Sequence, residues 1–266
     1  MSLTEAVATQ MYGRARVQVY ASLHALGGAA ARQAARVIQG AIAESGRARI
    51  VIATGNSQLA LIDALVRQEG VDWNRVAAFH MDEYVGISRD HPASFRKWIR
   101  TRVEERVRPG TMEYLEGDVP DLEVEMARYA RLLSAGPIDL AFVGIGENGH
   151  IAFNDPAVAD FEDPLAVKRV VLDEDCRRQQ VGEGHFANMD AVPREALTLT
   201  CPALFRAKTW ICSVPEARKA KAVRSSLEGP ISTLCPGSLV RTHPDATVYL
   251  DTDSSALLGR EPAKVG

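Results

Sequence analysis

The chain alternates between short, mostly apolar runs and longer stretches in which apolar residues recur at helical spacing. The short runs predict buried strands, and the spaced stretches predict helices. The predicted strands cover residues 48–53, 76–81, 138–143, 167–172, 208–213 and 246–250. The predicted helices cover residues 26–45, 59–66, 92–107, 122–133 and 216–227. Before residue 48 we expect only a short lead-in and one long helix, and the final dozen residues read as a tail.

Buried strands that alternate with helices are typical of a mostly parallel sheet covered on both faces. The 266 residues show no internal repeat and no low-complexity tract, so we predict a single doubly wound α/β domain over residues 1–266. In such sheets, ligands bind beyond the carboxyl ends of the strands. The turns that follow the predicted strands are therefore the places to look for chemistry.

Charge and cysteine content narrow the class of protein. The chain has 31 Lys and Arg against 34 Asp and Glu, so a net charge of −3 argues against a strongly basic nucleic-acid-binding protein. Its 4 cysteines have no zinc-ligand spacing and read as free thiols in a reducing compartment. We see no signal peptide and no apolar run of membrane-spanning length. These features predict a cytoplasmic protein without nucleic-acid or membrane partners.

The first polar turn follows the strand at 48–53 and leads into a helix. Its residues are Thr54, Gly55, Asn56 and Ser57. Backbone N–H groups and hydroxyls at such a turn suit a phosphate group. Side chains of the same types also cap helices, and spacing alone does not separate these two roles. Since the turn is neither a P-loop nor a GxGxxG fingerprint, no nucleotide cofactor is expected.

The second polar turn is FHMDEYVGI, in which Asp82 and Glu83 close an apolar strand. Neighbouring residues point in different directions, so we expect one carboxylate to face the site as a general base and the other to be structural. A solvated turn is the alternative.

The third turn is VGIGENGHIAFNDP, which ends the strand at 138–143. Its glycines, Gly146 among them, allow the backbone to approach a ligand closely. His150 is followed five residues later by Asp155. A histidine oriented by a carboxylate is a common proton-transfer pair, although a lone histidine is more often structural.

Basic residues near these turns are candidates for phosphate contacts. Arg177, Arg178, Lys219 and Lys221 carry the required charge, and arginine adds bidentate geometry. The alternative for each is a solvated surface side chain.

Taken together, FHMDEYVGI, HPASF, GIGENGHIAFNDP and VPREALTLT resemble the glucosamine-6-phosphate deaminase family, which shares its fold with 6-phosphogluconolactonases. The resemblance covers about residues 48–250. It implies a Rossmann-like fold of the sugar-phosphate isomerase type and a small-molecule sugar-phosphate substrate. The implied reaction converts glucosamine 6-phosphate and water into fructose 6-phosphate and ammonia, with no metal and no cofactor. Family members include monomers and hexamers, so a homo-oligomer is possible.

The resemblance also implies residue roles. Asp82 matches the base that moves a proton between C2 and C1 of the opened sugar, and His150 matches the histidine that opens the ring. Asp155 stands where the family has a glutamate that supports this histidine. The 54–57 turn and Lys219 match the phosphate contacts.

Three positions depart from the family pattern, and the first is Asp155, which is one methylene shorter than the family's glutamate. Asn148, counted here with the catalytic group, stands where the deaminases usually have an aspartate; it can hydrogen-bond but cannot ionise. The family's arginine before the VP segment is not visible in the sequence, and Arg177 or Arg178 is expected to contact phosphate instead. A lactonase-like hydrolase and a non-catalytic sugar-phosphate sensor are the alternative functions. The segment from Ile151 to Asn154 and the retained acids favour the deaminase.

Overall fold

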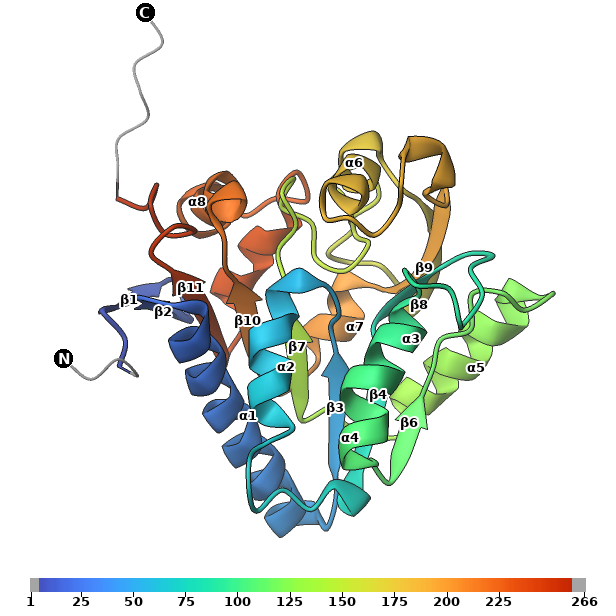
Figure 1. Cartoon of the computed structure of the whole chain (residues 1–266), viewed down its shortest axis with the longest axis horizontal. Helices are drawn as coiled ribbons and strands as arrows, with labels where there is room; N and C mark the ends of the chain where they lie inside the picture. Colours follow the sequence, from blue (N-terminus) through green and yellow to red (C-terminus); the bar gives the residue numbers. More distant parts are fainter. Residues whose placement is uncertain (1–4, 260–266) are drawn as a thin grey trace, which may run out of the picture.

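The computed structural model describes residues 5–259, and its centre is a twisted eight-stranded sheet (Figure 1). In spatial order the strands are β1 (Ala8–Tyr12), β2 (Ala15–Tyr20), β11 (Ala246–Asp251), β10 (Thr209–Val214), β7 (Leu140–Val143), β3 (Ala48–Ile52), β4 (Val76–His80) and β6 (Thr111–Glu113). All neighbours pair in parallel except β1, which pairs with β2 in an antiparallel hairpin. The predicted doubly wound, mostly parallel sheet is confirmed.

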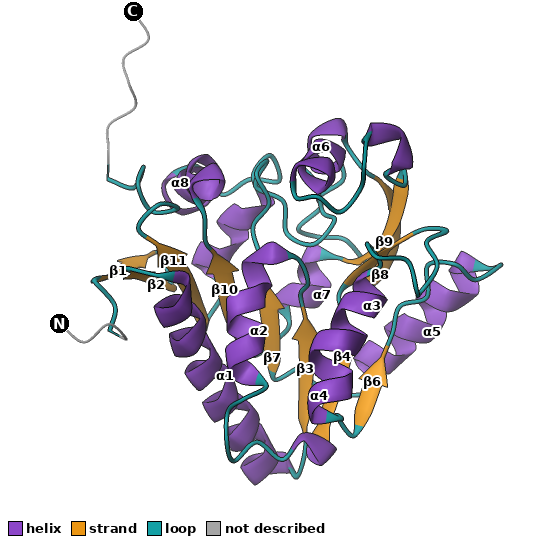
Figure 2. Ribbon diagram, in the orientation of Figure 1, coloured by secondary structure: helices purple, strands orange, loops and turns teal. Residues whose placement is uncertain are grey.

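Helices cover both faces of the sheet, as Figure 2 shows with α1 and α2 in front and α7 behind. The helices are α1 (Leu23–Ser45), α2 (Leu59–Leu65), α3 (Phe95–Ile99), α4 (Glu105–Val107), α5 (Leu122–Ser134), α6 (Glu174–Gly182), α7 (Cys201–Phe205) and α8 (Ala220–Glu228). The alanine-rich face of α1 is buried, and a Cβ added at Gly27 would lie 2.5 Å from the backbone of Ala60. Small side chains therefore let α1 approach α2 closely.

A second, three-stranded antiparallel sheet stands beside the main one. Its order is β5 (Asp82–Tyr84), β9 (Glu195–Leu199) and β8 (Val167–Val171), with Asp82 opposite Thr198. The strand predicted at 167–172 exists, but it belongs to this small sheet. β9 was not predicted. The small sheet matters for function because β5 carries both acids of the second polar turn.

The N-terminal expectation was wrong. A β-hairpin precedes α1 where only a lead-in was expected, and its turn uses Gly13 at φ 59°. The helix predicted at 92–107 starts later, because Ser94 caps α3, and it continues through a π-helical segment at 100–104. Helix α6 was missed altogether. Of the predicted tail, residues 260–266 lie outside the described part of the chain.

Within residues 5–259, no helix combines the length and apolar character that a bilayer crossing requires.

Candidate active site

A cleft opens beyond the carboxyl ends of β3, β4 and β7, where the topology of the sheet predicts a ligand site. It holds about 610 Å³ of space, open solvent included. Eight of the residues singled out from the sequence line it: Thr54, Gly55, Asn56, Ser57, Asp82, Gly146, His150 and Lys219. Five further residues line it that sequence reasoning missed: Phe95, Gln179, Gln180, Glu183 and His185.

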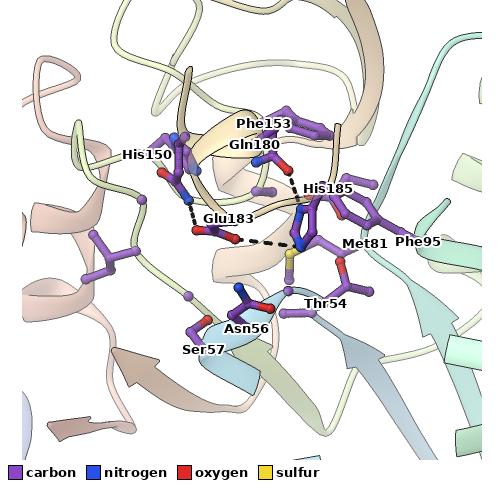
Figure 3. Close-up of a pocket in the computed structure, with 18 of the residues that line it drawn as sticks. Thr54, Asn56, Ser57, Met81, Phe95, His150, Phe153, Gln180, Glu183 and His185 are labelled. Atoms are coloured by element: carbon purple, nitrogen blue, oxygen red, sulfur yellow. Dashed lines mark hydrogen bonds and ion pairs between the residues drawn. The ribbon is translucent and has the colours of Figure 1, made fainter. Parts of the chain in front are cut away.

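The 54–57 turn forms one side of the cleft (Figure 3). Gly55 has φ 91°, a conformation that glycine adopts without strain, and it leads into a 3₁₀ turn at Asn56–Gln58. No side chain caps this turn or α2. Within the described residues, the side chains of Thr54 and Asn56 are not used in any internal hydrogen bond. The turn therefore presents free polar groups to the cleft.

Asp82 lies on β5 and is only 6% exposed. Burial raises its pKa to about 8, and the negative charge of Glu83 adds to the increase. A carboxyl group with this pKa is mostly protonated at neutral pH. A group whose pKa lies this close to working pH is suited to proton transfer.

Glu83, its neighbour, points away from the cleft and holds α3 in place. Its Oε2 accepts hydrogen bonds from the Ser94 hydroxyl (2.7 Å) and the Arg96 backbone N–H (3.0 Å), and lies 3.2 Å from Arg96 Nε. Burial raises the pKa of Glu83, although these contacts oppose that effect. The two acids thus divide as expected, with Asp82 toward the cleft and Glu83 in the framework.

His150 follows β7 in a loop whose conformation requires glycine at position 146. A Cβ at Gly146 would lie 2.2 Å from Cε1 of the His150 ring, so the ring packs directly against the glycine backbone. Nδ1 of His150 lies 2.9 Å from Oδ1 of Asp155. The ring N–H is not aligned with the carboxylate, so this contact is an ion-pair distance rather than a well-formed hydrogen bond.

Asn148 organises this loop from behind the cleft and does not line it. Its Nδ2 donates to Asp155 Oδ1 (3.0 Å) and to Asp173 Oδ2 (3.1 Å), and its Oδ1 accepts from the His150 backbone N–H (3.0 Å). Burial acts to raise the pKa of Asp155, but His150 and Asn148 outweigh it and hold that pKa below its usual value. Asn148 therefore acts on the site by positioning Asp155 and the His150 backbone.

Lys219 sits at the start of α8 and is 3% exposed. Burial lowers its pKa, while Glu183 opposes that change. Its Nζ lies 3.9 Å from Oε1 of Glu183, whose carboxylate also lies 3.1 Å from Arg218 Nη1. A buried lysine that faces a cleft with one long ion pair is a candidate anion contact.

Glu183 and His185 come from the turn after α6, and Figure 3 shows Glu183 facing the 54–57 turn. His185 Nδ1 lies 2.9 Å from Gln180 Oε1, which also accepts the Tyr84 hydroxyl at 2.7 Å. Since an amide oxygen only accepts, Nδ1 carries the proton and Nε2 faces Glu183 at 3.9 Å. The polar segment EDCRRQQVG gave no apolar pattern that could have revealed this lining.

Arg178, expected at the phosphate, is not at the cleft. Its side chain is 57% exposed and pairs with Glu174 and Asp175 on its own helix. Arg177 donates to the Val192 carbonyl (3.2 Å) and lines a separate hollow. Lys221 is exposed. Of the four basic candidates, only Lys219 reaches the cleft.

One group of potential metal ligands lies beside the cleft: His150, Asp155 and Cys176, with ligand atoms within 4.8 Å of one another. Burial and the nearby carboxylates of Asp155 and Asp173 raise the pKa of the Cys176 thiol well above its usual value. This shift disfavours the thiolate, the form in which cysteine binds a metal.

Known proteins resemble this chain over most of its length. Residues 21–249 match the family of glucosamine-6-phosphate isomerases and 6-phosphogluconolactonases. A glucosamine-6-phosphate deaminase of Arthrobacter sp. (strain FB24) is 34% identical over 85% of this chain and 87% of its own. A glucosamine-6-phosphate deaminase of Listeria innocua is 31% identical over 86% of this chain and 96% of its own.

Solved structures extend the comparison. A structure described as a monomeric glucosamine-6-phosphate deaminase superposes with a TM-score of 0.83 at 31% identity, covering 91% of this chain and 99% of that one. A 6-phosphogluconolactonase from Shewanella baltica superposes with a TM-score of 0.73 at 19% identity, with the same coverage of 91% and 99%. The second match shows a shared fold.

Proposed function

Because the chain belongs to the family of glucosamine-6-phosphate isomerases and 6-phosphogluconolactonases, we propose that it is a glucosamine-6-phosphate deaminase. It converts glucosamine 6-phosphate and water into fructose 6-phosphate and ammonia. One observation carries the proposal: Asp82 and His150 line the same cleft as the 54–57 turn and Lys219. Two proton-transfer groups and an anion site share one cavity.

The phosphate of the substrate binds at the 54–57 turn. The backbone N–H groups and free hydroxyls of the turn donate to its oxygens, and Lys219 supplies a positive charge. Anchoring the sugar at this end fixes its reacting carbons relative to Asp82 and His150, which lowers the entropic part of the barrier.

Ring opening belongs to His150. The imidazole takes the proton of the anomeric hydroxyl and a proton is returned to the ring oxygen, so the C1–O5 bond breaks and C1 becomes an aldehyde. Asp155, 2.9 Å from Nδ1, orients the ring and stabilises it when it carries the extra proton.

Isomerisation belongs to Asp82. The carboxylate removes the C2 proton and delivers it to C1, while the substrate's ammonium group gives up one proton and the C1 oxygen takes one up. The product is an iminium ion at C2. Water adds to C2, the C–N bond breaks, and ammonia leaves the C2 ketone of fructose 6-phosphate. The ammonium group of the bound substrate favours the ionised form of Asp82, which offsets the increase in the Asp82 pKa that burial causes.

The alternative activity, that of a lactonase, is supported by the shared fold, and nothing in the cleft favours it over the deaminase.

The location and the assembly of the protein are also part of the proposal. All four cysteines are free thiols, which supports a reducing compartment, and we propose that the protein is cytoplasmic. Each chain carries its own cleft, and a homo-oligomer would not be required for the chemistry.

The test is an assay of ammonia and fructose 6-phosphate formed from glucosamine 6-phosphate. We expect equal amounts of the two products and a loss of roughly a thousandfold or more in Asp82→Asn, which keeps the shape but removes the base. Glu83→Gln is the matched control for losing a neighbouring carboxylate. Rapid hydrolysis of 6-phosphogluconolactone without ammonia release would replace the deaminase by the lactonase.

A further inference from the structure

A second groove is lined by residues of α1, β2 and β11 and of the hairpin that precedes α1; Figure 1 shows these elements at one edge of the main sheet. The centre of a water molecule can occupy about 620 Å³ of this groove, against about 80 Å³ of the cleft, and the two share no lining residue. In a doubly wound sheet this face would normally be covered by a helix with apolar contacts. Here the residues of α1, β2 and β11 that line the groove are mostly polar or charged.

The floor of the groove comes from two parallel strands. Side chains of β2 alternate between the two faces of the sheet, so Arg16, Gln18 and Tyr20 share one face. The register places Arg16 beside Thr247 and Gln18 beside Tyr249. The two tyrosine rings stack with centroids 6.0 Å apart.

The wall comes from α1. Arg32 and Arg36 are one turn apart on this helix, and Gln33 lies between them. Gln33 Nε2 donates to Thr247 Oγ1 at 3.2 Å, and Gln33 Oε1 accepts the Tyr249 hydroxyl. These two bonds hold the wall to the floor, so the groove is a fixed feature of the fold.

Four arginines line the groove: Arg14, Arg16, Arg32 and Arg36. Within residues 5–259, no carboxylate oxygen lies within 4.0 Å of any of their charged nitrogens. The acid at the rim, Asp245, instead accepts a hydrogen bond from the Thr209 hydroxyl at 2.7 Å. A chain of net charge −3 thus gathers four unpaired positive charges in one place, and arginines at i and i+4 of a helix repel each other.

Three of these four charges act on the hydroxyl group of Tyr249 at the base of the groove. Burial raises the pKa of Tyr249 and Tyr20 adds to the increase, while the charges of Arg36, Arg16 and Arg32 pull it down. Positive charge from both the strand and the helix therefore acts on one hydroxyl at the base of the groove.

We propose that this groove is a second binding site, which takes a small phosphorylated metabolite separate from the substrate in the cleft. Guanidinium groups bind phosphate oxygens in pairs, and the amides and hydroxyls of the floor provide further polar contacts. A volume of 620 Å³ is typical of a small-molecule site. Met11 is the exposed large apolar residue in the lining, so the groove lacks the apolar anchors that a protein partner would use.

The experiment titrates the full-length protein with inorganic pyrophosphate at low salt and measures heat. Wild-type protein is expected to bind at two places, the cleft and the groove. Arg32→Gln/Arg36→Gln should weaken the groove event about tenfold or more and leave the cleft event and ammonia release unchanged. Lys219→Met should weaken the cleft event and leave the groove event unchanged. The matched control is Arg67→Gln/Arg131→Gln, which removes the same charge from exposed positions outside both sites.

The proposal is overturned if Arg32→Gln/Arg36→Gln binds like the wild type, or if the Arg67 and Arg131 control weakens binding by the same factor. The second result would mean that pyrophosphate responds only to overall charge. Because the titration does not depend on turnover, it stands even if the protein proves not to act on glucosamine 6-phosphate.

Discussion

At the scale of single residues, we expect the environment of Asp82 to decide the pH dependence of the proposed reaction. A buried carboxyl group beside another carboxylate has its pKa raised to about 8, and only its ionised form can remove the C2 proton. The same side chain on the protein surface would be ionised at any pH near neutrality. The position of β5, rather than the residue type, makes Asp82 responsive to pH.

We therefore expect kcat/KM for glucosamine 6-phosphate to rise as pH increases up to about 8 and then to level off. The measurement is initial ammonia release between about pH 6 and pH 9. Because the substrate also titrates in this range, the control is Glu83→Gln, which removes the charge that helps raise the pKa of Asp82. Its profile should shift to lower pH. A profile that does not move would mean that the substrate or another residue controls the rise.

Asn148 shows how the structure changes the interpretation of a departure from a family pattern. Its amide group donates to the carboxylates of Asp155 and Asp173. A donor shared by the two groups weakens the repulsion between their negative charges. An aspartate at this position would add a third carboxylate and remove the amide that donates to the other two.

We expect Asn148→Asp to lower both stability and activity rather than to improve catalysis. Losing two hydrogen bonds to charged groups and adding a like charge costs about 2–4 kcal/mol of unfolding free energy. Urea unfolding and ammonia release measure the two effects. Asn148→Ala, which loses the bonds without adding charge, should be milder, and Asp173→Asn should partly rescue Asn148→Asp. Higher activity in Asn148→Asp would contradict this account.

At the scale of elements, α6 shapes the cleft although few of its residues are buried. Asp173 caps the helix by accepting the Cys176 backbone N–H at 2.6 Å, and Gln180 ties it to Tyr84 on β5. The turn that follows places the Glu183 carboxylate near Lys219 and Arg218. If Lys219 binds the substrate's phosphate as proposed, this carboxylate competes with the phosphate for the same cation.

Glu183→Gln should therefore lower KM for glucosamine 6-phosphate about three- to tenfold with little change in kcat, because the phosphate no longer competes with a carboxylate for Lys219. Steady-state kinetics at constant ionic strength provides the measurement. Glu174→Gln is the matched control, since it removes the same charge from an exposed position at the start of α6. An increase in KM would show instead that Glu183 binds the substrate.

At the scale of the whole molecule, the N-terminal hairpin completes the main sheet. β2 pairs in parallel with β11, and Val17 and Tyr20 are buried against the core. Without β2, the backbone of β11 would form an exposed apolar edge, which favours association between chains.

A chain that begins at residue 21 should lose about 3 kcal/mol or more of unfolding free energy, from the apolar surface of Val17 and Tyr20 alone. It should also form larger species on warming. Thermal unfolding with light scattering tests both effects, and a chain that begins at residue 5 serves as control. An unchanged melting temperature and a monodisperse sample would show that the hairpin is dispensable.

The sequence determined the parts of this protein that depend on local pattern. Central parallel strands are buried on both faces, so β3 and β7 appear as continuous apolar runs, and the polar turns after them mark the ligand-binding edge. The same pattern failed at β2, because ARVQVY is a partly exposed strand beside the edge strand β1 and alternates arginine and glutamine with apolar residues. It failed at α6, because only Cys176 and Gln180 of that helix are buried.

Only the tertiary structure decided which side chains meet. The motifs give the positions of Asp82, His150 and Lys219 along the sequence. They do not show that Glu183 reaches Lys219 or that Arg178 points to solvent. Those outcomes depend on contacts between residues distant in sequence, where the direction of a side chain is fixed by packing and by hydrogen bonds from other elements. Local composition determines which elements form, and the cleft and the arginine groove arise from how the elements are packed together.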